Sequence, residues 1–488
     1  MSITEAPLEL LPAPGLLVGD GRIDRASGGS HQHVYAATGR PTVEVPLAGE
    51  KEIGEAVTAA RAAADGWRTT PPDRRRDLLL RLAELIVADA EWLAPLQTVE
   101  NGVPRQFTAA MPRAAADFLR YNAGWADKIG GDTVPVWPAR ALDYTLDEPY
   151  GVVAVIIPWN GGVVSMGQML GPALAAGNTV VVKPSELAPF AALRVGELAL
   201  AAGLPPGVVN VVPGGAEGGQ ALVRHPGVDK VHFTGSGGTA RKILESALPH
   251  LTPVGLELGG KSAHLIFADG DLRIAARQAL TGAVALNGQG CANGTRILVE
   301  APVYDEVLRI ALGRLRHIAL GDPLRDGTMM GPVVTRSACE RIMRVIETAR
   351  ERGDGRLVAG GQRAGGDLAD GYFITPTVFA DVDNASDLAQ EEIFGPVLSF
   401  LRFESEQDAV RLANDTRYGL AAYVHTNDLR RAHRVSRALE VGNVWVNGFP
   451  GLSPSVPFGG VKQSGYGRIG GAAGIREFLR PKNVWVAA

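Results

Sequence analysis

A cysteine between small residues is the side chain with the clearest chemical potential in this sequence. Cys291 stands in residues 288–292, which read GQGCA, and its small neighbours leave the thiol approachable. A thiolate is a strong nucleophile, although a free thiol has a pKa of about 8.5. A lone cysteine is more often a buried structural residue, so both interpretations stay open on Cys291 alone. The second cysteine, Cys339, lies in a helix-like run over 336–352 and is interpreted as structural.

Two other side chains have the chemistry to assist a nucleophile. Glu257 lies between two leucines and before Gly259 and Gly260, so its carboxylate would be partly desolvated, which favours a general base. A surface glutamate at a strand end is the alternative, and it is favoured when Glu257 is considered alone. Asn160 follows an apolar run, where its amide could stabilise an oxyanion at the carboxyl end of a strand. A turn-forming asparagine is an equal alternative.

Groups suited to a nucleotide follow two other expected strands. Lys183 and Glu186 stand where a strand ends, and there an acid can accept hydrogen bonds from a ribose diol. Residues 233–238 (FTGSGG) form a glycine-rich turn that opens a helix and offers N–H groups to a pyrophosphate. The turn is not a standard dinucleotide fingerprint and is weak evidence alone. His31 and His33 have no third ligand grouped with them, so we expect a solvated loop and no metal site.

Two α/β units are expected to position these residues. Continuous apolar strands at 152–157, 180–182, 208–212 and 231–233 alternate with helices at 166–176 and 189–202, which predicts a parallel, doubly wound, nucleotide-binding sheet. A second α/β stretch over 262–454 has candidate strands at 264–267, 296–299, 421–425 and 444–446, and a glycine-rich loop at 352–371.

The remaining segments predict packing helices and an exposed arm. Ala-rich residues 53–67 predict a helix, and Thr70 with Pro71 predicts the N-cap and first position of the next. Residues 133–147 alternate like an exposed hairpin, and residues 483–486 resemble a terminal strand. Exposed strand edges tend to pair with other chains unless something covers them. Either a second subunit or pairing within the chain would cover these edges.

Composition limits the class of protein. The chain has 488 residues, a net charge of -4 and 46% hydrophobic residues, so two or three domains are expected and no nucleic-acid or acidic-membrane partner. Two distant cysteines favour a reducing compartment. No signal pattern opens the chain and no apolar run approaches the roughly 20 residues that span a bilayer, so the cytoplasm is expected.

Seven segments, in this order, resemble the aldehyde dehydrogenase superfamily. They are 158–160 (PWN), 183–186 (KPSE), 233–236 (FTGS), 256–261 (LELGGK), 288–291 (GQGC), 391–396 (EEIFGP) and 457–460 (PFGG). The resemblance extends from about Val34 to Val486, nearly the whole chain. It implies an α/β fold with a Rossmann-like cofactor domain (1–130 and 151–257), an α/β catalytic domain (258–455, with 456–472 returning to the cofactor domain) and a β oligomerisation arm (131–150 and 473–488).

The resemblance also implies a role for each matched residue. Cys291 would attack the aldehyde carbonyl, Asn160 and the backbone N–H of Cys291 would form the oxyanion hole, and Glu257 would activate the water that hydrolyses the thioester. Redox chemistry would belong to a nicotinamide cofactor. Its binding residues would be Ile156, Pro158, Trp159, Lys183, Ser185, Glu186, Gly215, Phe233, Thr234, Gly235, Ser236, Leu258, Gly259, Glu392 and Phe394.

Glu186 bears on the choice of cofactor. A carboxylate on the ribose diol would repel a 2′-phosphate, so NAD is expected over NADP. The resemblance further implies that the arm joins subunits into a homodimer or homotetramer, with a small aldehyde as the other partner.

Several residues depart from the usual family pattern. Gly161 and Gly162 stand where relatives often carry bulky residues, and small residues also flank Cys291. We therefore expect a roomy entrance for a medium or large hydrophobic or aromatic aldehyde. Its expected lining is Gly161, Ser165, Gln168, Gly290, Ala292, Leu452 and Phe458. Ile469 replaces a glutamate linked with proton relay from the general base, which puts the route of deacylation in doubt.

Two alternatives remain at this stage. A CoA-acylating relative would pass the acyl group to a thiol, but such relatives typically lack the glutamate that this chain has at Glu257. A non-catalytic structural or binding relative would have no reason to keep Cys291, Asn160 and Glu257 together.

Overall fold

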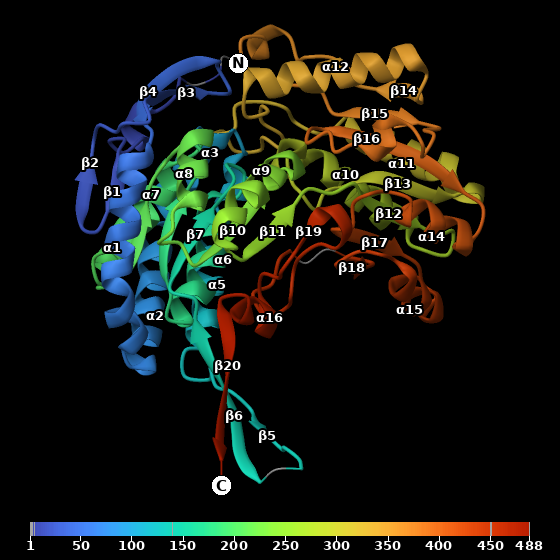
Figure 1. The fold of residues 1–488 in the computed structure, drawn as a ribbon. Coiled ribbons are helices and arrows are strands. Elements are labelled where there is room, and N and C mark those ends of the chain that lie inside the picture. The colour runs from blue at the N-terminus through green and yellow to red at the C-terminus, as the bar shows by residue number, and fades with distance from the viewer. Residues whose placement is uncertain (1–2, 4, 139, 449–450, 488) are drawn as a thin grey trace.

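The chain forms two twisted sheets side by side and an arm that projects away from both (Figure 1). The structure is a computed structural model that describes residues 3, 5–138, 140–448 and 451–487. Both sheets have helices on their two faces, so the expected α/β class is confirmed.

The first sheet has the strand order β19-β11-β10-β7-β8-β9-β1-β2. Its parallel core confirms the doubly wound pattern, because β7, β8, β9, β10 and β11 all pair in parallel. The strands are β1 (Leu16–Val18), β2 (Gly21–Ile23), β7 (Val152–Ile156), β8 (Thr179–Lys183), β9 (Val209–Val211), β10 (Lys230–Gly235), β11 (Val254–Leu258) and β19 (Gly465–Tyr466).

Alternate residues of each buried strand enter different cores, as the two-residue period of a strand requires. Val153 and Val155 of β7 pack with one set of helices, whereas Val152 and Ala154 face another set. The first set includes α2 (Pro72–Ala88), α3 (Ala90–Asn101), α5 (Met111–Ala123), α6 (Gly162–Ala175) and α7 (Phe190–Ala201). The second set is α1 (Glu50–Thr69), α8 (Ala216–Arg224) and α9 (Gly237–Ala247).

The second sheet has the strand order β14-β15-β16-β13-β12-β17-β18. Its strands are β12 (Ser262–Ile266), β13 (Gly294–Glu300), β14 (Arg356–Ala359), β15 (Thr377–Ala380), β16 (Val397–Phe403), β17 (Ala421–His425) and β18 (Asn443–Val446). Helices α10 (Leu272–Val284) and α11 (Tyr304–Leu315) share one core with it. Helices α12 (Arg336–Arg352), α13 (Asp387–Gln390), α14 (Glu406–Asn414) and α15 (Leu429–Ala438) share the other.

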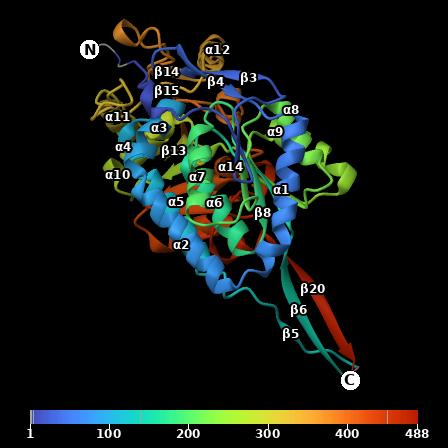
Figure 2. The same cartoon turned by 90° about the vertical axis from the view of Figure 1, so that its left-hand side faces the viewer.

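The arm is a three-stranded antiparallel sheet in the order β20-β6-β5 (Figure 2). It is built from β5 (Thr133–Val134), β6 (Ala141–Pro149) and β20 (Leu479–Ala487). Pairing within the chain, one of the two expected sources of cover, is therefore present between β6 and β20 along their whole length. Near the first sheet, β3 (Ser30–Tyr35) and β4 (Arg40–Pro46) form a separate hairpin, α4 (Arg105–Thr108) follows α3, and α16 (Gly471–Arg476) precedes β20.

Three local expectations were wrong. Thr70 does not cap α2: its N–H bonds to the carbonyl of Trp67 and its hydroxyl to that of Gly66, so it ends α1 and Pro71 occupies the N-cap of α2. The glycine-rich stretch 352–371 is not all loop, because β14 lies within it and pairs with β15.

His31 and His33 also lie outside any loop, since both belong to β3. The His33 ring is buried, bonds to Thr42 Oγ1 at 2.6 Å and meets Phe190 edge-on. Across the part of the chain that the structure describes, no helix is long and apolar enough to cross a membrane.

Candidate active site

Two adjoining cavities hold the residues that the sequence singled out for catalysis and cofactor binding. One, of about 580 Å³, lies at the carboxyl ends of β7, β8 and β10 and is lined by Lys183, Glu186 and Gly215 among others. The other, of about 420 Å³, is lined by Cys291, Glu257, Asn160, Glu392 and Phe394 among others. The two cavities share Pro158, Trp159, Thr234, Gly235 and Ser236, so they form one elongated site. Every predicted catalytic and cofactor residue lines at least one of them.

The loop before Cys291 has an unusual backbone that is fixed by side chains. Leu286 and Asn287 have φ angles of 50° and 58°, in the left-handed region that non-glycine residues rarely adopt. The Asn287 amide donates to the carbonyls of Gly102 and Pro332 at 2.9 and 2.8 Å and accepts from the N–H of Gly331. These buried bonds stabilise the strained turn that presents Cys291 to the cavity.

The other side of Cys291 is tied to the second sheet. Tyr423 on β17 donates from its hydroxyl to the carbonyl of Ala292 at 2.8 Å, and its ring stacks on His264 with centroids 4.3 Å apart. The Asn293 amide donates to the carbonyl of Ala285 at 3.2 Å. The thiol therefore stands on a loop that is held from both directions.

Cys291 is a protonated thiol at neutral pH in this structure. Burial, together with the nearby carboxylates of Glu392 and Glu257, raises the pKa of Cys291 to about 12. A nucleophilic thiolate would therefore require transfer of the thiol proton to a neighbouring base.

Glu257 is buried at the end of β11 and is 4% exposed. Neither of its carboxylate oxygens has a hydrogen-bond partner among the described residues. Burial raises the pKa of Glu257 well above the usual carboxylate range, and Arg468 opposes the shift while Glu477 adds to it. Such a pKa suits a group that must take up a proton near neutral pH.

Asn160 lies in the turn between β7 and α6, at the edge of the cavity. Its side-chain nitrogen donates to the carbonyl of Gln289 at 2.8 Å, two residues before Cys291. Gln289 is itself fixed, since its side-chain oxygen accepts the N–H of Val334 at 3.1 Å. An amide nitrogen carries two protons, so a second donor remains for an oxygen at the cavity.

The larger cavity has a cation, a carboxylate and a helix start arranged along it. Lys183 is buried, which lowers its pKa to about 8, and its ammonium donates to the carbonyls of Pro184 and Gly214. Ser185 contacts Glu186 and accepts the N–H of Leu187. Ser236 caps α9 by accepting the N–H of Thr239 at 3.3 Å.

At the junction with the smaller cavity, Trp159 and Phe394 meet edge-on with ring centroids 5.8 Å apart. Glu392 accepts the N–H of Gly260 at 3.1 Å, and burial raises its pKa to about 7 against the opposing effects of Lys261 and Arg341. A Cβ at Gly259 would collide with the Glu392 carboxylate at 1.9 Å, so glycine is required for this approach.

The seven residues predicted for the substrate entrance line neither of these cavities. Ala292 and Phe458 pack beside Cys291, whereas Leu452 is 40% exposed. Gly161 leaves less room than expected, because a Cβ there would lie 2.1 Å from Ser165 Oγ. Gln168 is buried in α6, and Gly290 lies against the side chain of Asn293.

Sequence reasoning did not find several residues at the site. Trp445 and Leu420 pack with Cys291, Ala292 and Phe458 in one apolar cluster. Arg341 on α12 lines the smaller cavity and donates to the carbonyl of Ile393 at 2.7 Å. These residues come from segments with no motif of their own, and only the folded chain brings them to Cys291.

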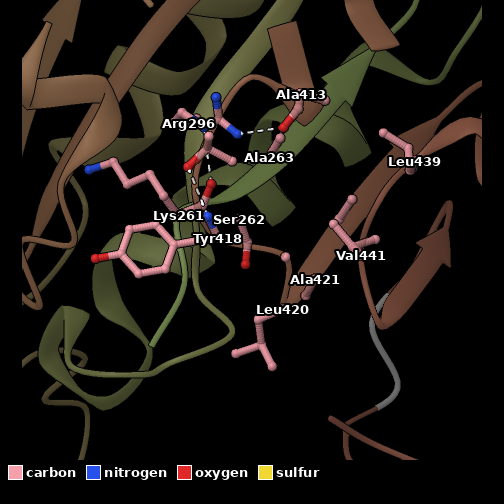
Figure 3. A pocket seen from close by; sticks show the side chains of 13 residues that line it. Lys261, Ser262, Ala263, Arg296, Ala413, Tyr418, Leu420, Ala421, Leu439 and Val441 are labelled. Carbon is pink, nitrogen blue, oxygen red and sulfur yellow. Dashed lines mark hydrogen bonds between the residues drawn. The ribbon is translucent and has the colours of Figure 1, made fainter. Parts of the chain in front are cut away.

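A third cavity adjoins the turn between β11 and β12, at Lys261 and Ser262 (Figure 3). Its volume is about 10 Å³, room for about one water molecule. Arg296 fixes this turn by donating to the carbonyls of Lys261 and Ala413 at 3.0 and 2.8 Å. The cavity is too small for a substrate and shares no lining residue with the two larger ones.

The elongated site fits a nicotinamide dinucleotide. The turn at Gly237 and Gly238 has open space around it and a helix start behind it, which suits a pyrophosphate. Glu186 lines the larger cavity and Glu392 the smaller one, and a carboxylate has the chemistry to accept hydrogen bonds from a ribose diol. A sheet of this topology, with its ligand site at the carboxyl ends of parallel strands and a cysteine at one end, is the architecture of a dinucleotide-dependent oxidoreductase.

Comparison with known proteins gives the family. A sequence model of the Aldehyde dehydrogenase family matches residues 23–484. An aldehyde dehydrogenase of Aspergillus niger is 40% identical over 96% of this chain and 94% of its own. The mitochondrial aldehyde dehydrogenase family 2 member B4 of Arabidopsis thaliana is 42% identical over 97% of this chain and 88% of its own.

Solved structures agree with the sequence comparisons. The NAD+ complex of an aldehyde dehydrogenase from Bacillus cereus has a TM-score of 0.95 and 37% identity, with 100% of both chains covered. Betaine aldehyde dehydrogenase from Staphylococcus aureus, in complex with NAD+, has a TM-score of 0.95 and 33% identity, and the match covers 99% of this chain and 97% of that one. The chain belongs to the aldehyde dehydrogenase family, and it is an oxidoreductase that acts on aldehydes with a nicotinamide dinucleotide.

Proposed function

We propose that this enzyme oxidises an aldehyde to a carboxylic acid with NAD, through a thioester on Cys291 that water hydrolyses. The observation that carries the proposal is the convergence of Cys291, Asn160 and Glu257 on one cavity, which opens into the cavity of Lys183 and Glu186. A nucleophile, an amide donor and a buried base are the three groups that this chemistry requires.

The first half of the reaction forms a bond to Cys291. The thiol proton of Cys291 passes to water in the cavity as the sulfur attacks the carbonyl carbon. The negative charge on the oxygen is stabilised by the Asn160 amide and the N–H of Cys291. A nicotinamide cofactor, when bound, would supply the hydride acceptor, and loss of hydride from the adduct would leave a thioester on Cys291. Trp159 and Phe394 place apolar rings beside the junction of the two cavities.

The second half releases the acid. Glu257 takes a proton from a water molecule as the water oxygen attacks the thioester carbon, and the bond to sulfur breaks. The presence of a buried glutamate with a raised pKa favours hydrolysis over transfer to the thiol of coenzyme A.

NAD is favoured over NADP by the position of Glu186. This carboxylate lines the larger cavity near Lys183 and Ser185, and it would repel a 2′-phosphate on the adenosine ribose. The apolar group at the other end, formed by Phe458, Trp445 and Leu420 next to Cys291, favours a hydrophobic or aromatic aldehyde.

The arm suggests that the enzyme is a homodimer or homotetramer. It exposes large apolar side chains: Trp137 is 85% exposed and Leu142 is 54% exposed, and Trp485 and Val486 are about half exposed. An exposed apolar patch on a projecting sheet is typical of a protein interface. We propose residues 131–150 and 473–488 as this oligomerisation arm, residues 1–130 and 151–257 as the cofactor domain, and residues 258–455 as the catalytic domain, with 456–472 returning to the cofactor domain.

The test is formation of the reduced cofactor by purified protein over a panel of linear and aromatic aldehydes, with NAD and NADP in parallel. We expect turnover with NAD that is fastest on bulky apolar aldehydes and absent in Cys291→Ser. Equal rates with both cofactors would contradict the role of Glu186. A strong preference for acetaldehyde would contradict the expected preference for bulky apolar aldehydes, and turnover by Cys291→Ser would contradict the role of Cys291 as nucleophile.

A further inference from the structure

Glu257 must release a proton in every turnover of the proposed reaction. Each hydrolysis leaves one proton on Glu257, and this proton must depart before the next turnover. Glu257 is 4% exposed, and neither of its oxygens has a partner among the described residues. Ile469 supplies no titratable group at the position where many family members carry a glutamate. Another path to solvent is therefore needed.

A second carboxylate lies next to Glu257 on the same face of β11. Gly255 and Glu257 are two residues apart and so point to the same face, roughly 6.6 Å from each other along the strand. A Cβ at Gly255 would lie 2.6 Å from Oε1 of Glu477 and 3.0 Å from the ring of His232. The Glu477 carboxylate therefore covers Gly255 and is the neighbour of Glu257 on this face.

Glu477 is held in place by a nearly buried cation. It follows α16 directly, and its Oε1 accepts from Nζ of Lys230 on β10 at 2.8 Å. The side chain of Glu477 is 17% exposed and that of Lys230 is 5% exposed. Glu477 thus lies where the buried face of the sheet meets solvent, because its side chain keeps this small exposed fraction.

Unpaired polar atoms lie near both carboxylates. Both ring nitrogens of His232 and both oxygens of Glu257 are buried without a partner in the part of the chain that the structure describes. Buried groups of this kind usually bond to ordered water. Glycines bring the backbone up to both acids: a Cβ would lie 2.6 Å from Glu257 Oε1 at Gly459 and 3.1 Å from the Glu477 carboxylate at Gly467.

We propose that Glu477, positioned by Lys230, carries the proton of Glu257 to solvent. The inference rests on the proposed function. As the water oxygen bonds to the thioester carbon and the carbon–sulfur bond breaks, one water proton passes to Glu257. The second water proton leaves with the carboxylic acid and passes to the Cys291 thiolate, which restores the thiol and leaves the product as a carboxylate. The proton on Glu257 then moves through ordered water to Glu477 and from Glu477 to bulk water. Both carboxylates return to their starting charge, and no other reactant is needed.

The test separates acyl-enzyme formation from hydrolysis. A stopped-flow experiment mixes enzyme and NAD with an aldehyde that the enzyme oxidises and records NADH, first as a burst and then as steady turnover. We expect Glu477→Gln to keep the burst rate and to lower the steady rate about tenfold. Glu477→Asp, which keeps a carboxylate, should recover part of the loss. Glu406→Gln, which removes a partly buried carboxylate from ion pairs with Arg431 and Arg434 on the second sheet's helices, is the matched control and should behave as wild type.

The pH profile is a second measurement. The groups that face Glu477 are Lys230 and His232 on β10, Glu257 on β11 and Tyr466 on β19. Loss of the Glu477 charge removes one cause of the raised pKa of Glu257. The rising limb of the steady rate should therefore move to lower pH in Glu477→Gln.

Two results would overturn the relay. A steady rate within twofold of wild type would show that the proton leaves elsewhere, and an equal fall of burst and steady rates would show a purely structural role. If Glu477→Gln does not fold, the double variant Lys230→Met/Glu477→Gln replaces it. This variant removes both charges of the buried pair, a change that proteins often tolerate, and the same two results would overturn the relay. Glu257→Gln, measured in parallel, tests the proposed function itself: it should give a burst with almost no turnover.

Discussion

Replacing Asn160 with alanine tests whether its side-chain amide stabilises the oxyanion. The change removes the amide whose nitrogen lies 2.8 Å from the carbonyl of Gln289. If its second proton serves the oxyanion, loss of that donor should lower kcat by about 10²–10³, or about 2.7–4 kcal/mol in the transition state. The folded state loses one neutral hydrogen bond, which contributes about 1 kcal/mol. The effect on catalysis should therefore exceed the effect on unfolding by about 2–3 kcal/mol.

The assay compares kcat for NADH formation with the free energy of unfolding in urea. Asn414→Ala is the matched control, because it also removes an amide that donates to a backbone carbonyl, that of Ala438 at 2.8 Å, but lies on α14 away from both cavities. It should lose stability and keep its activity. A kcat for Asn160→Ala within fivefold of wild type, or losses of activity that merely follow losses of stability, would refute the assignment of Asn160.

Three further predictions concern charge and assembly. Burial raises the pKa of Glu257 in the folded state, so its contribution to stability is fully present below the unfolded pKa of about 4.3 and is lost as pH rises through the folded value. Glu257→Gln should therefore unfold at a higher temperature than wild type at pH 8, and the difference should shrink towards pH 5. Glu186→Ser should raise kcat/KM for NADP relative to NAD by about tenfold or more, since a like-charge repulsion is removed. Leu142→Asp should convert the oligomer to smaller species in light scattering at micromolar concentration.

Each of these has an outcome that contradicts it. If Glu257→Gln unfolds at the same temperature as wild type at every pH, burial does not raise the pKa of Glu257 in the folded state. An unchanged NADP to NAD ratio would remove Glu186 from cofactor choice. Leu429→Asp, a change at a residue 72% exposed on α15, is the control for the arm: equal dissociation by both variants, or by neither, would contradict the proposed interface.

Local pattern was enough to predict β7, β8, β9 and β10 of the first sheet, whereas β1, β2, β11 and β19 were not predicted. Runs such as 152–157 are apolar at every position because both faces of a parallel sheet are covered, and the structure buries all of β7. Asn160 and Lys183 could be placed at the site for the same reason, since the carboxyl ends of parallel strands meet at one edge. Glu257 was harder: only the packed structure reveals that its strand end is buried.

Contacts between distant segments set the roles of several residues that local sequence patterns do not predict. Thr70 has the composition of a helix N-cap, but its hydroxyl bonds back to Gly66 because α1 ends there. Glu477 belongs to no motif, and it lies near Glu257 only because the chain returns to the first sheet through β19. Tyr423 is far from Cys291 in the sequence, yet its hydroxyl holds the nucleophile loop.

The most direct test of the account is the mass of the acyl-enzyme. The Glu257→Gln variant is mixed with NAD and an aldehyde that wild type oxidises, and the reaction is quenched in acid. The protein is then digested, and the masses of the two cysteine-containing peptides are measured by mass spectrometry. We predict that the peptide containing Cys291 gains the mass of the acyl group, with one NADH formed per subunit, while the peptide with Cys339 is unchanged. NADH formation with no adduct on Cys291, or with an adduct on another residue, would contradict the thioester mechanism.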